Sequence, residues 1–290
     1  MKNKAILSAL VLILISAFFI SCGKSTKPKK QIDTKPISVK LFDTQPGADP
    51  SVSAEQGGEG FKGEGWETVA NYNIAGDSNA IKGGTFAMRI PDFPNTLRTV
   101  GKDANSYVNN LMDLGLLYEG LLSQDPVTED WIPGLATHWR VSEDKKQFWY
   151  RINPNARWAD GKPVVAEDVV ATWKLMVDPG ILEAYSNILY GTYEQPVAES
   201  KYIVSVKTKE LNWRQFLYFS GSMRILPAHH IGNIKGGEYL EKYQFEVVPG
   251  SGPYALLKED ISKGQTVTFR RRSDYWAQKE RFNVGINNFD

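Results

Sequence analysis

The side chains that most often carry enzyme or metal chemistry are scarce in this sequence. One cysteine, Cys22, excludes an internal disulfide framework and a cysteine-rich zinc site. Of the three histidines, His229 and His230 are adjacent, so on a regular element they should point to different faces and not form a metal pair. His138 precedes Trp139 in an apolar stretch, which favours a packing role. We therefore expect no metal site and no cofactor.

No nucleophile or phosphate motif is complete. Gly250-Ser251-Gly252 is the nearest approach to a nucleophile elbow, but Pro249 stands where the outer glycine of G-x-S-x-G is needed. Residues 58–63 have the spacing of a dinucleotide-binding loop, yet no β-branched strand precedes them. The sequence therefore predicts no enzyme. A glycosidase-type pair stays open as an alternative, because carboxylates are numerous and nothing selects two of them.

The amino-acid composition limits the kinds of molecule that the protein could bind. The chain of 290 residues has 34 Lys and Arg against 33 Asp and Glu, and this balance argues against a nucleic-acid partner recruited by charge. With 42% hydrophobic and 23% charged residues, the composition is that of a globular protein. Aromatic residues reach 12%, which favours packing and surfaces that bind flat or extended ligands.

The amino terminus has the pattern of an export signal. Lys2 and Lys4 precede an apolar run over residues 5–20, whose helix of about 24 Å is shorter than the roughly 30 Å hydrocarbon core of a membrane. The run ends in Ser21-Cys22-Gly23, which resembles the bacterial lipobox. We expect residues 1–21 to be a lipoprotein signal peptide and Cys22 to carry lipid. A buried structural cysteine or an uncleaved anchor are the alternatives.

The residues after the signal differ from the rest of the chain. Residues 22–82 are rich in Lys, Pro, Gly, Glu, Asp, Ser and Thr, and we expect a flexible tether that holds a globular body off a membrane. Residues 83–290 contain alternating apolar patterns typical of strands and helices. These patterns predict strands at 85–90, 147–152, 202–207 and 265–270, and helices at 105–122 and 166–177. The fold class is α/β or α+β.

Several short segments occur in an order that resembles one protein family. The segments are LYEGLL at 117–122, PGLATHW at 133–139, SED at 142–144, FWYRI at 148–152, RWADGKP at 157–163, EDV at 167–169, GSGPY at 250–254 and DYW at 274–276. Together they resemble the family 5 extracellular solute-binding proteins, the peptide-binding components of ABC importers.

The resemblance implies an α/β, two-lobe periplasmic-binding-protein-like fold, with the ligand enclosed between the lobes. It assigns residues 83–290 to the first lobe, with an extra subdomain inserted at about 118–243. On this alignment the chain ends at the hinge to a second lobe that is missing from it. Since each lobe would supply part of the ligand contacts, we expect the 290 residues alone to bind a ligand weakly.

The resemblance also implies candidate ligand-binding residues. Tyr185 follows the stretch in which the family places a cleft-lining tyrosine, and Gly250, Ser251 and Gly252 match a loop whose backbone runs along the ligand. Ser220 and Gly221 lie where another cleft position falls. We expect Tyr185 and the loop of residues 250–252 to face one cleft.

The resemblance implies a lipid-anchored solute-binding protein of the periplasm or cell surface. Its partners would be a peptide or another small-molecule ligand, an ABC permease in the inner membrane, and the membrane itself through Cys22. An oligosaccharide-binding protein or an extracytoplasmic glycoside hydrolase are the alternatives, because aromatic rings stack on sugars. A purely structural surface lipoprotein is a further alternative, suggested only by the anchor and the tether.

Overall fold

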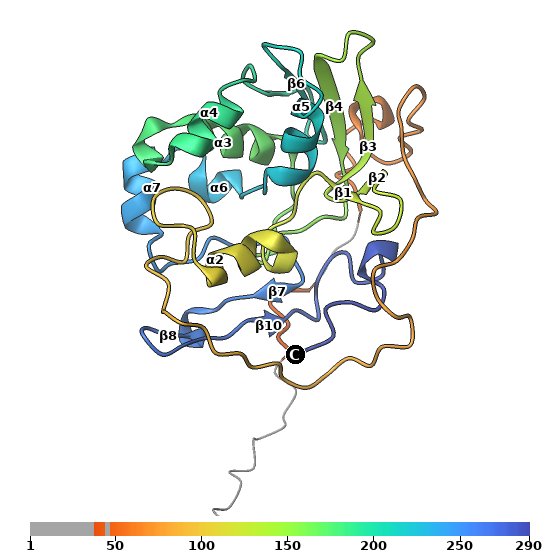
Figure 1. Cartoon of the computed structure of the whole chain (residues 1–290). Coiled ribbons are helices and arrows are strands. Elements are labelled where there is room, and N and C mark those ends of the chain that lie inside the picture. Colours follow the sequence, from red (N-terminus) through yellow and green to blue (C-terminus); the bar gives the residue numbers. More distant parts are fainter. Residues whose placement is uncertain (1–37, 44–46) are drawn as a thin grey trace, which may run out of the picture. The chain divides into compact units, whose positions relative to one another are not determined.

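A computed structural model describes residues 38–43 and 47–290, which lie within one compact unit, residues 36–290 (Figure 1). The expected signal peptide, Cys22 and the first part of the expected tether lie outside the described residues, so these assignments stay predictions. Within the described ranges, no helix has the length and apolar character needed to cross a membrane.

The largest sheet among the described residues is antiparallel and has four strands. Its strands are β3 (Ala136–Val141), β4 (Gln147–Ile152), β5 (Val197–Ala198) and β6 (Ile203–Lys207), in the order β3-β4-β6-β5. In β4, Phe148, Tyr150 and Ile152 are buried in alternation with less buried neighbours. This pattern confirms the strand predicted at 147–152, since one face of an antiparallel sheet packs on the core.

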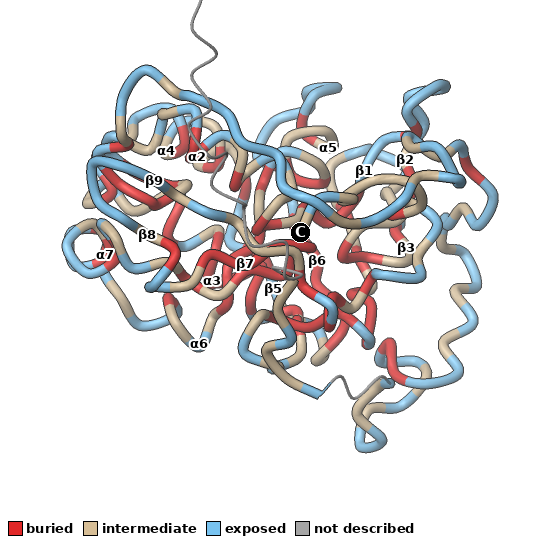
Figure 2. Tube along the Cα trace, turned by 90° about the horizontal axis from the view of Figure 1, so that it is seen from below, coloured by how far each residue is buried: buried red, intermediate tan, exposed pale blue. Residues whose placement is uncertain are grey.

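Helix α3 (Ala166–Val177) packs against β5 and β6 and against two shorter helices, α4 (Ala184–Tyr190) and α6 (Ala228–Ile231). It begins at the predicted residue. Val165 has no side-chain acceptor for the first turn, but the carboxylate of Asp168 accepts from the Val165 backbone N–H at 2.7 Å. Figure 2 shows buried residues concentrated along α3, β6 and β7, while the outer segments are exposed.

Short elements complete the unit. The remaining strands are β1 (Leu122–Gln124), β2 (Trp131–Pro133), β7 (Tyr254–Ala255), β8 (Ile261–Ser262), β9 (Thr266–Val267) and β10 (Arg270–Arg271), in the pairs β1-β2, β7-β10 and β8-β9. The remaining helices and helical turns are η1 (Ala54–Gln56), α2 (Tyr107–Leu111), η2 (Met112–Leu116), η3 (Pro179–Ile181), α5 (Gln215–Leu217), η4 (Tyr218–Ser222), α7 (Gly236–Lys242), η5 (Lys258–Asp260) and η6 (Arg281–Asn283).

Three predicted elements differ from the structure. The strand predicted at 265–270 is divided into β9 and β10, which belong to different two-stranded sheets. The helix predicted at 105–122 is divided into α2 and the π-helical turn η2, and it ends there because Gly115 has a φ of 103°, outside the helical region. The strand predicted at 85–90 is wrong: this segment forms no ladder and is mostly exposed. Its residues suit a strand, but the backbone bonds to residues 288–290 are made by Gly83 and Gly84, just before the segment, and residues 85–90 themselves form no ladder with them.

The expected free tether is corrected for residues 38–43 and 47–82, which contact the rest of the unit. Glu67 and Trp139 exchange two backbone hydrogen bonds, of 2.7 and 3.0 Å, along the edge of β3. Arg151 donates to the Gly57 carbonyl at 2.9 Å, and Val39 donates its N–H to the Arg271 carbonyl. Figure 1 shows this segment, in orange, beside β3. Its polar composition provides no core of its own, so it is held by bonds to an existing strand edge. The subdomain predicted at about 118–243 stays a prediction.

Candidate functional site

Ser220 and Gly221 lie on the turn η4. Ser220 is fully buried, and its Oγ is hydrogen-bonded to the Tyr150 hydroxyl at 2.7 Å, which attaches η4 to β4 of the four-stranded sheet. Gly221 packs beside the indole of Trp131, where an added Cβ would lie 3.2 Å from the ring. The Ser220 hydroxyl is therefore occupied inside the protein, and Gly221 is the member of this pair that reaches a surface.

The loop of residues 250–252 packs against the backbone that follows η2. A Cβ on Gly250 would lie 2.1 Å from the Leu117 carbonyl oxygen, and Gly252 donates its N–H to the same oxygen at 2.8 Å. Ser251 is fully buried, and its carbonyl accepts from the Trp276 indole at 3.1 Å. The close approach that the two glycines permit is thus made by the chain's own backbone.

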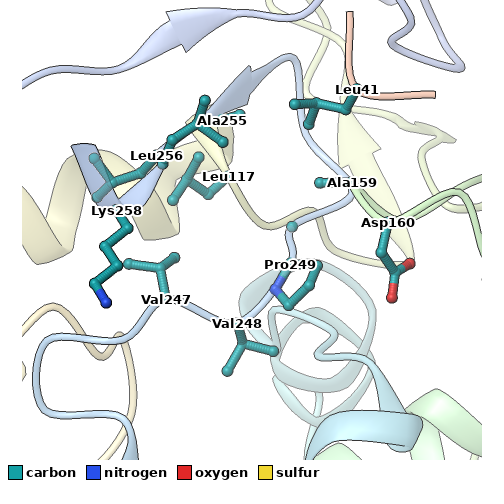
Figure 3. A pocket seen from close by; sticks show the side chains of 12 residues that line it. Leu41, Leu117, Ala159, Asp160, Val247, Val248, Pro249, Ala255, Leu256 and Lys258 are labelled. Atoms are coloured by element: carbon teal, nitrogen blue, oxygen red, sulfur yellow. The ribbon is translucent and has the colours of Figure 1, made fainter. Parts of the chain in front are cut away.

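Gly250 also lines a pocket with a volume of about 250 Å³. Its other lining residues are Leu41, Leu117, Ala159, Asp160, Val247, Val248, Pro249, Ala255, Leu256, Leu257 and Lys258. Figure 3 shows mainly apolar side chains around it, with the charged Asp160 and Lys258 on opposite sides. Such a lining suits an apolar group flanked by polar ends.

The second pocket, of about 270 Å³, is lined by residues of β1, β2 and η4, among them Gly221. The other lining residues are Leu122, Ser123, Gln124, Trp131, Leu217, Ser222 and Arg224. Trp131 offers an aromatic ring and Arg224 a positive charge, a combination that suits a ligand with both apolar and anionic groups.

Arg224 joins this pocket to the turn η2. Its Nε donates to the Asp113 carbonyl at 2.5 Å, and its Nη1 donates to the Gly221 carbonyl at 2.9 Å. Burial raises the pKa of the Asp113 carboxyl to about 6, although the positive charge of Arg224 lowers it; Glu183 raises it further. Asp113 and Arg224 were not predicted as site residues. A carboxylate within the apolar pattern at 105–122 was the signal that could have indicated Asp113.

Tyr185 lies on α4 with 69% of its surface exposed. The neighbouring Ile188 is 73% exposed and lies three residues along the same helix, so the two side chains share a face. Burial raises the pKa of the Tyr190 hydroxyl, and the charge of Asp113 and the phenol of Tyr185 raise it further. Tyr185 lines neither of the two pockets, so a cleft shared with the loop of residues 250–252 stays a prediction.

The histidines behave differently from the prediction. His229 Nε2 lies 2.6 Å from Asp160 Oδ2, and His230 Nε2 lies 3.6 Å from the same oxygen. Although the two histidines are adjacent, both side chains approach one carboxylate, so adjacency did not keep them apart. Both histidines belong to the single-turn helix α6, and that carboxylate lies outside the helix. The expectation of no metal site stays a prediction.

Comparison with known proteins gives one family. Residues 130–286 match the bacterial extracellular solute-binding proteins of family 5, in their middle region. A probable peptide-binding protein, YejA, of Agrobacterium fabrum is 30% identical over 225 residues, which are 73% of this chain and 34% of that protein. A peptidoglycan-binding protein, YepA, of the same organism is 29% identical over 176 residues, covering 60% of this chain and 28% of that protein.

A solved structure shows the same fold. The oligopeptide-binding protein AppA of Bacillus subtilis, in complex with a nonapeptide, has a TM-score of 0.60 at 20% identity. The match covers 70% of this chain and 39% of AppA. This likeness confirms the predicted fold class, a lobe of the periplasmic-binding-protein kind. The chain spans about a third of the length of the curated relatives it matches.

Proposed function

Because the chain belongs to the bacterial extracellular solute-binding proteins of family 5, we propose that it captures peptides outside the cytoplasm and delivers them to the permease of an ABC transporter. The name of YejA, a probable peptide-binding protein, supports a peptide ligand. YepA is a peptidoglycan-binding protein, and its ligand contains both peptide and sugar parts. We further propose that lipid on Cys22 anchors it to the membrane and that capture involves no catalysis.

The observation that carries this proposal is the pocket that Gly221 shares with Arg224, whose guanidinium also donates to the Asp113 backbone carbonyl. We propose that the binding surface extends from this pocket to Asp113 and the exposed Tyr185, and we name these four residues the ligand face. It combines a carboxylate, a guanidinium, an exposed ring and a pocket beside Gly221. A peptide offers the matching groups: charged termini for the two ionic side chains and apolar side chains for the ring and pocket. The face thus suits an extended zwitterionic ligand better than a neutral one.

An oligosaccharide is the second candidate ligand. The exposed rings of Tyr185 and Trp213 favour it, because flat aromatic faces stack on sugar rings. An oligosaccharide would make little use of the Asp113 and Arg224 charges, so the two ligand classes differ in how binding should respond to salt.

The test is ligand-observed NMR on the purified full chain in detergent, which detects weak binding. We expect mixed tri- to pentapeptides to bind, and their binding to weaken as salt is added. Tyr185→Ala should reduce binding by about three- to tenfold, since an aromatic contact contributes roughly 0.5–1.5 kcal/mol. Phe86→Ala removes an exposed ring outside the ligand face and serves as the matched control.

Two results would contradict the proposal. Binding of oligosaccharides but not of peptides would favour the second candidate. Peptides or oligosaccharides that are cleaved during the measurement would indicate a hydrolase, because a binding protein leaves its ligand chemically unchanged.

A further inference from the structure

We propose that Asp160, His229 and His230 form a binding site for a divalent transition-metal ion, with Zn²⁺ as the expected occupant. One ligating atom from each of these residues lies within 4.8 Å of the other two. Imidazole nitrogen and carboxylate oxygen are ordinary ligands for Zn²⁺. The site is separate from the ligand face and independent of the proposed function.

The distances are close to those of a coordination shell. His229 Nε2 and His230 Nε2 lie 2.6 and 3.6 Å from Asp160 Oδ2, and the two imidazole rings are inclined by 59° with centroids 4.7 Å apart. Zinc bonds of about 2.0–2.2 Å in a tetrahedron separate neighbouring ligand atoms by roughly 3.3 Å. Small side-chain rotations would therefore place an ion between the three atoms.

The site is open to solvent on one side. Between 23% and 31% of the surface of the three side chains is exposed, so an ion can enter and water can complete its coordination. In this structure a hydrogen bond joins His229 Nε2 to Asp160 Oδ2. Metal binding would take the place of the proton in that bond: a neutral imidazole would then carry its proton on Nδ1, and a protonated one would release one proton to the solvent.

The carboxylate is oriented before any ion binds. Asp160 precedes Gly161, whose φ of 85° makes the turn possible, and the turn is closed by backbone bonds between Trp158 and residues 161 and 162. Asp160 Oδ1 accepts the Lys162 backbone N–H at 3.2 Å. This bond holds one oxygen, and Oδ2 is left facing the histidines, as outer partners orient ligands in known metal sites.

One buried residue fixes the two segments relative to each other. Asp168 accepts from the Trp158 indole at 3.1 Å, on the segment that carries Asp160. It also accepts from the Ala228 backbone N–H at 2.6 Å, at the start of the helix that carries both histidines. Asp168 and Trp158 are almost completely inaccessible to solvent. Ligands held by such a rigid support lose little freedom when an ion binds.

A simple ion pair explains this arrangement less well. One protonated histidine is enough to neutralise Asp160, and a second protonated imidazole beside it would add repulsion between like charges. Two neutral imidazoles and one carboxylate are ordinary ligands for a divalent ion, and they bring no repulsion between like charges. The sequence prediction of no metal site followed from the adjacency of the histidines and did not consider a shared partner on another segment.

The experiment is Zn²⁺ titration of the full chain, purified without a histidine tag and treated with a chelator. We expect one Zn²⁺ to bind per chain. Asp160→Asn, His229→Ala and His230→Ala should each weaken binding by more than the roughly 10- to 100-fold that loss of an outer-shell partner costs. The chain has only one further histidine, so His138→Ala is a matched control and should bind Zn²⁺ as the wild type does.

Two further measurements keep the test decisive. His230→Gln retains most of the side-chain volume, and circular dichroism will show whether each variant is folded. Visible absorption of bound Co²⁺ should indicate nitrogen and oxygen ligands, and it should be lost in the three site variants. Zn²⁺ affinity that is equal in the wild type and the folded site variants would overturn the proposal. So would the absence of any binding by the wild type at millimolar Zn²⁺.

Discussion

The loop of residues 250–252 and the ligand face both contain residues that were expected to meet a ligand, yet they are built in opposite ways. The loop is mostly buried, and its glycines allow the backbone to lie against Leu117. The ligand face has an exposed tyrosine and a carboxylate whose pKa is raised to about 6. A glycine in a motif thus indicates a close approach but does not identify what approaches. Substitutions in the loop should mainly lower folding stability. Substitutions on the ligand face should mainly lower ligand binding.

The largest expected effect is that of Gly250→Ala. The new Cβ would lie 2.1 Å from the Leu117 carbonyl oxygen, so one backbone segment must move. We expect a loss of about 3 kcal/mol or more in the free energy of unfolding, at the upper end for overpacked sites. Urea unfolding followed by circular dichroism measures it.

Gly237→Ala is the matched control, because nothing lies within 4 Å of a Cβ at that position in α7. Alanine there should leave stability unchanged or raise it by about 0.5–1 kcal/mol. Equal effects of the two substitutions would show that the loop of residues 250–252 is free to move, as a ligand-contacting loop could be.

The next effect concerns Asp113→Asn and depends on pH. The pKa of Asp113 is about 6 in the folded chain, above its ordinary value of 3.8, so folding favours the protonated carboxyl. Its contribution to stability is present below pH 4 and is lost as the pH rises through 6. The asparagine variant should therefore be more stable than the wild type at pH 8, by on the order of 2 kcal/mol.

Urea unfolding from pH 4 to 8 measures this difference for the wild type and the variant. The gap should close toward pH 4 and open toward pH 8. If the stability difference between the two proteins is constant over this range, the pKa of Asp113 is not raised in the folded chain, and the ligand face holds no carboxylate of raised pKa.

A smaller effect is expected for Ser220→Ala. The substitution leaves the buried Tyr150 hydroxyl without its partner at 2.7 Å, which should cost roughly 1.5 kcal/mol. Thermal unfolding of the Ser220→Ala variant measures this cost. The control is Ser222→Ala, because Ser222 belongs to the same turn and is exposed. If Ser220→Ala weakens peptide binding and leaves the melting temperature unchanged, the serine contacts ligand as the family resemblance implied.

The smallest effect on stability is expected for Tyr185→Ala. With 69% of its surface exposed, the ring loses few contacts on truncation, and the free energy of unfolding should change by less than about 0.5 kcal/mol. Differential scanning calorimetry of the variant and the wild type will show this. A large drop in stability would mean that Tyr185 supports the packing of α4, and its reduced binding could not then be read as a lost contact.

Local patterns in the sequence were sufficient for the regular core. The alternation of Phe148, Tyr150 and Ile152 predicted β4, and the spacing of Val169, Trp173 and Met176 predicted α3, because each element buries one face. The segment 85–90 shows the limit of this reasoning. It has the residues of a strand, but a strand is completed only by a neighbour from elsewhere in the chain.

The site depended on contacts between distant segments, which local patterns do not contain. The pairing of Arg224 with the backbone of Asp113 joins two turns more than a hundred residues apart. The approach of His229 and His230 to Asp160 depends in the same way on the buried Asp168. Family resemblance indicated Tyr185 and Gly221 but gave no information on which side chains would surround them.

The claim that the ligand lies on the face of Asp113, Tyr185, Gly221 and Arg224 can be tested by photo-crosslinking. Tri- to pentapeptides carrying a benzophenone group would be irradiated with the full chain, and the attachment sites mapped by mass spectrometry, with excess unlabelled peptide as the competitor. We predict competed crosslinks in α4, η2 and η4 and in Arg224. Competed crosslinks confined to the pocket between Asp160 and Lys258, with none on these elements, would contradict the account.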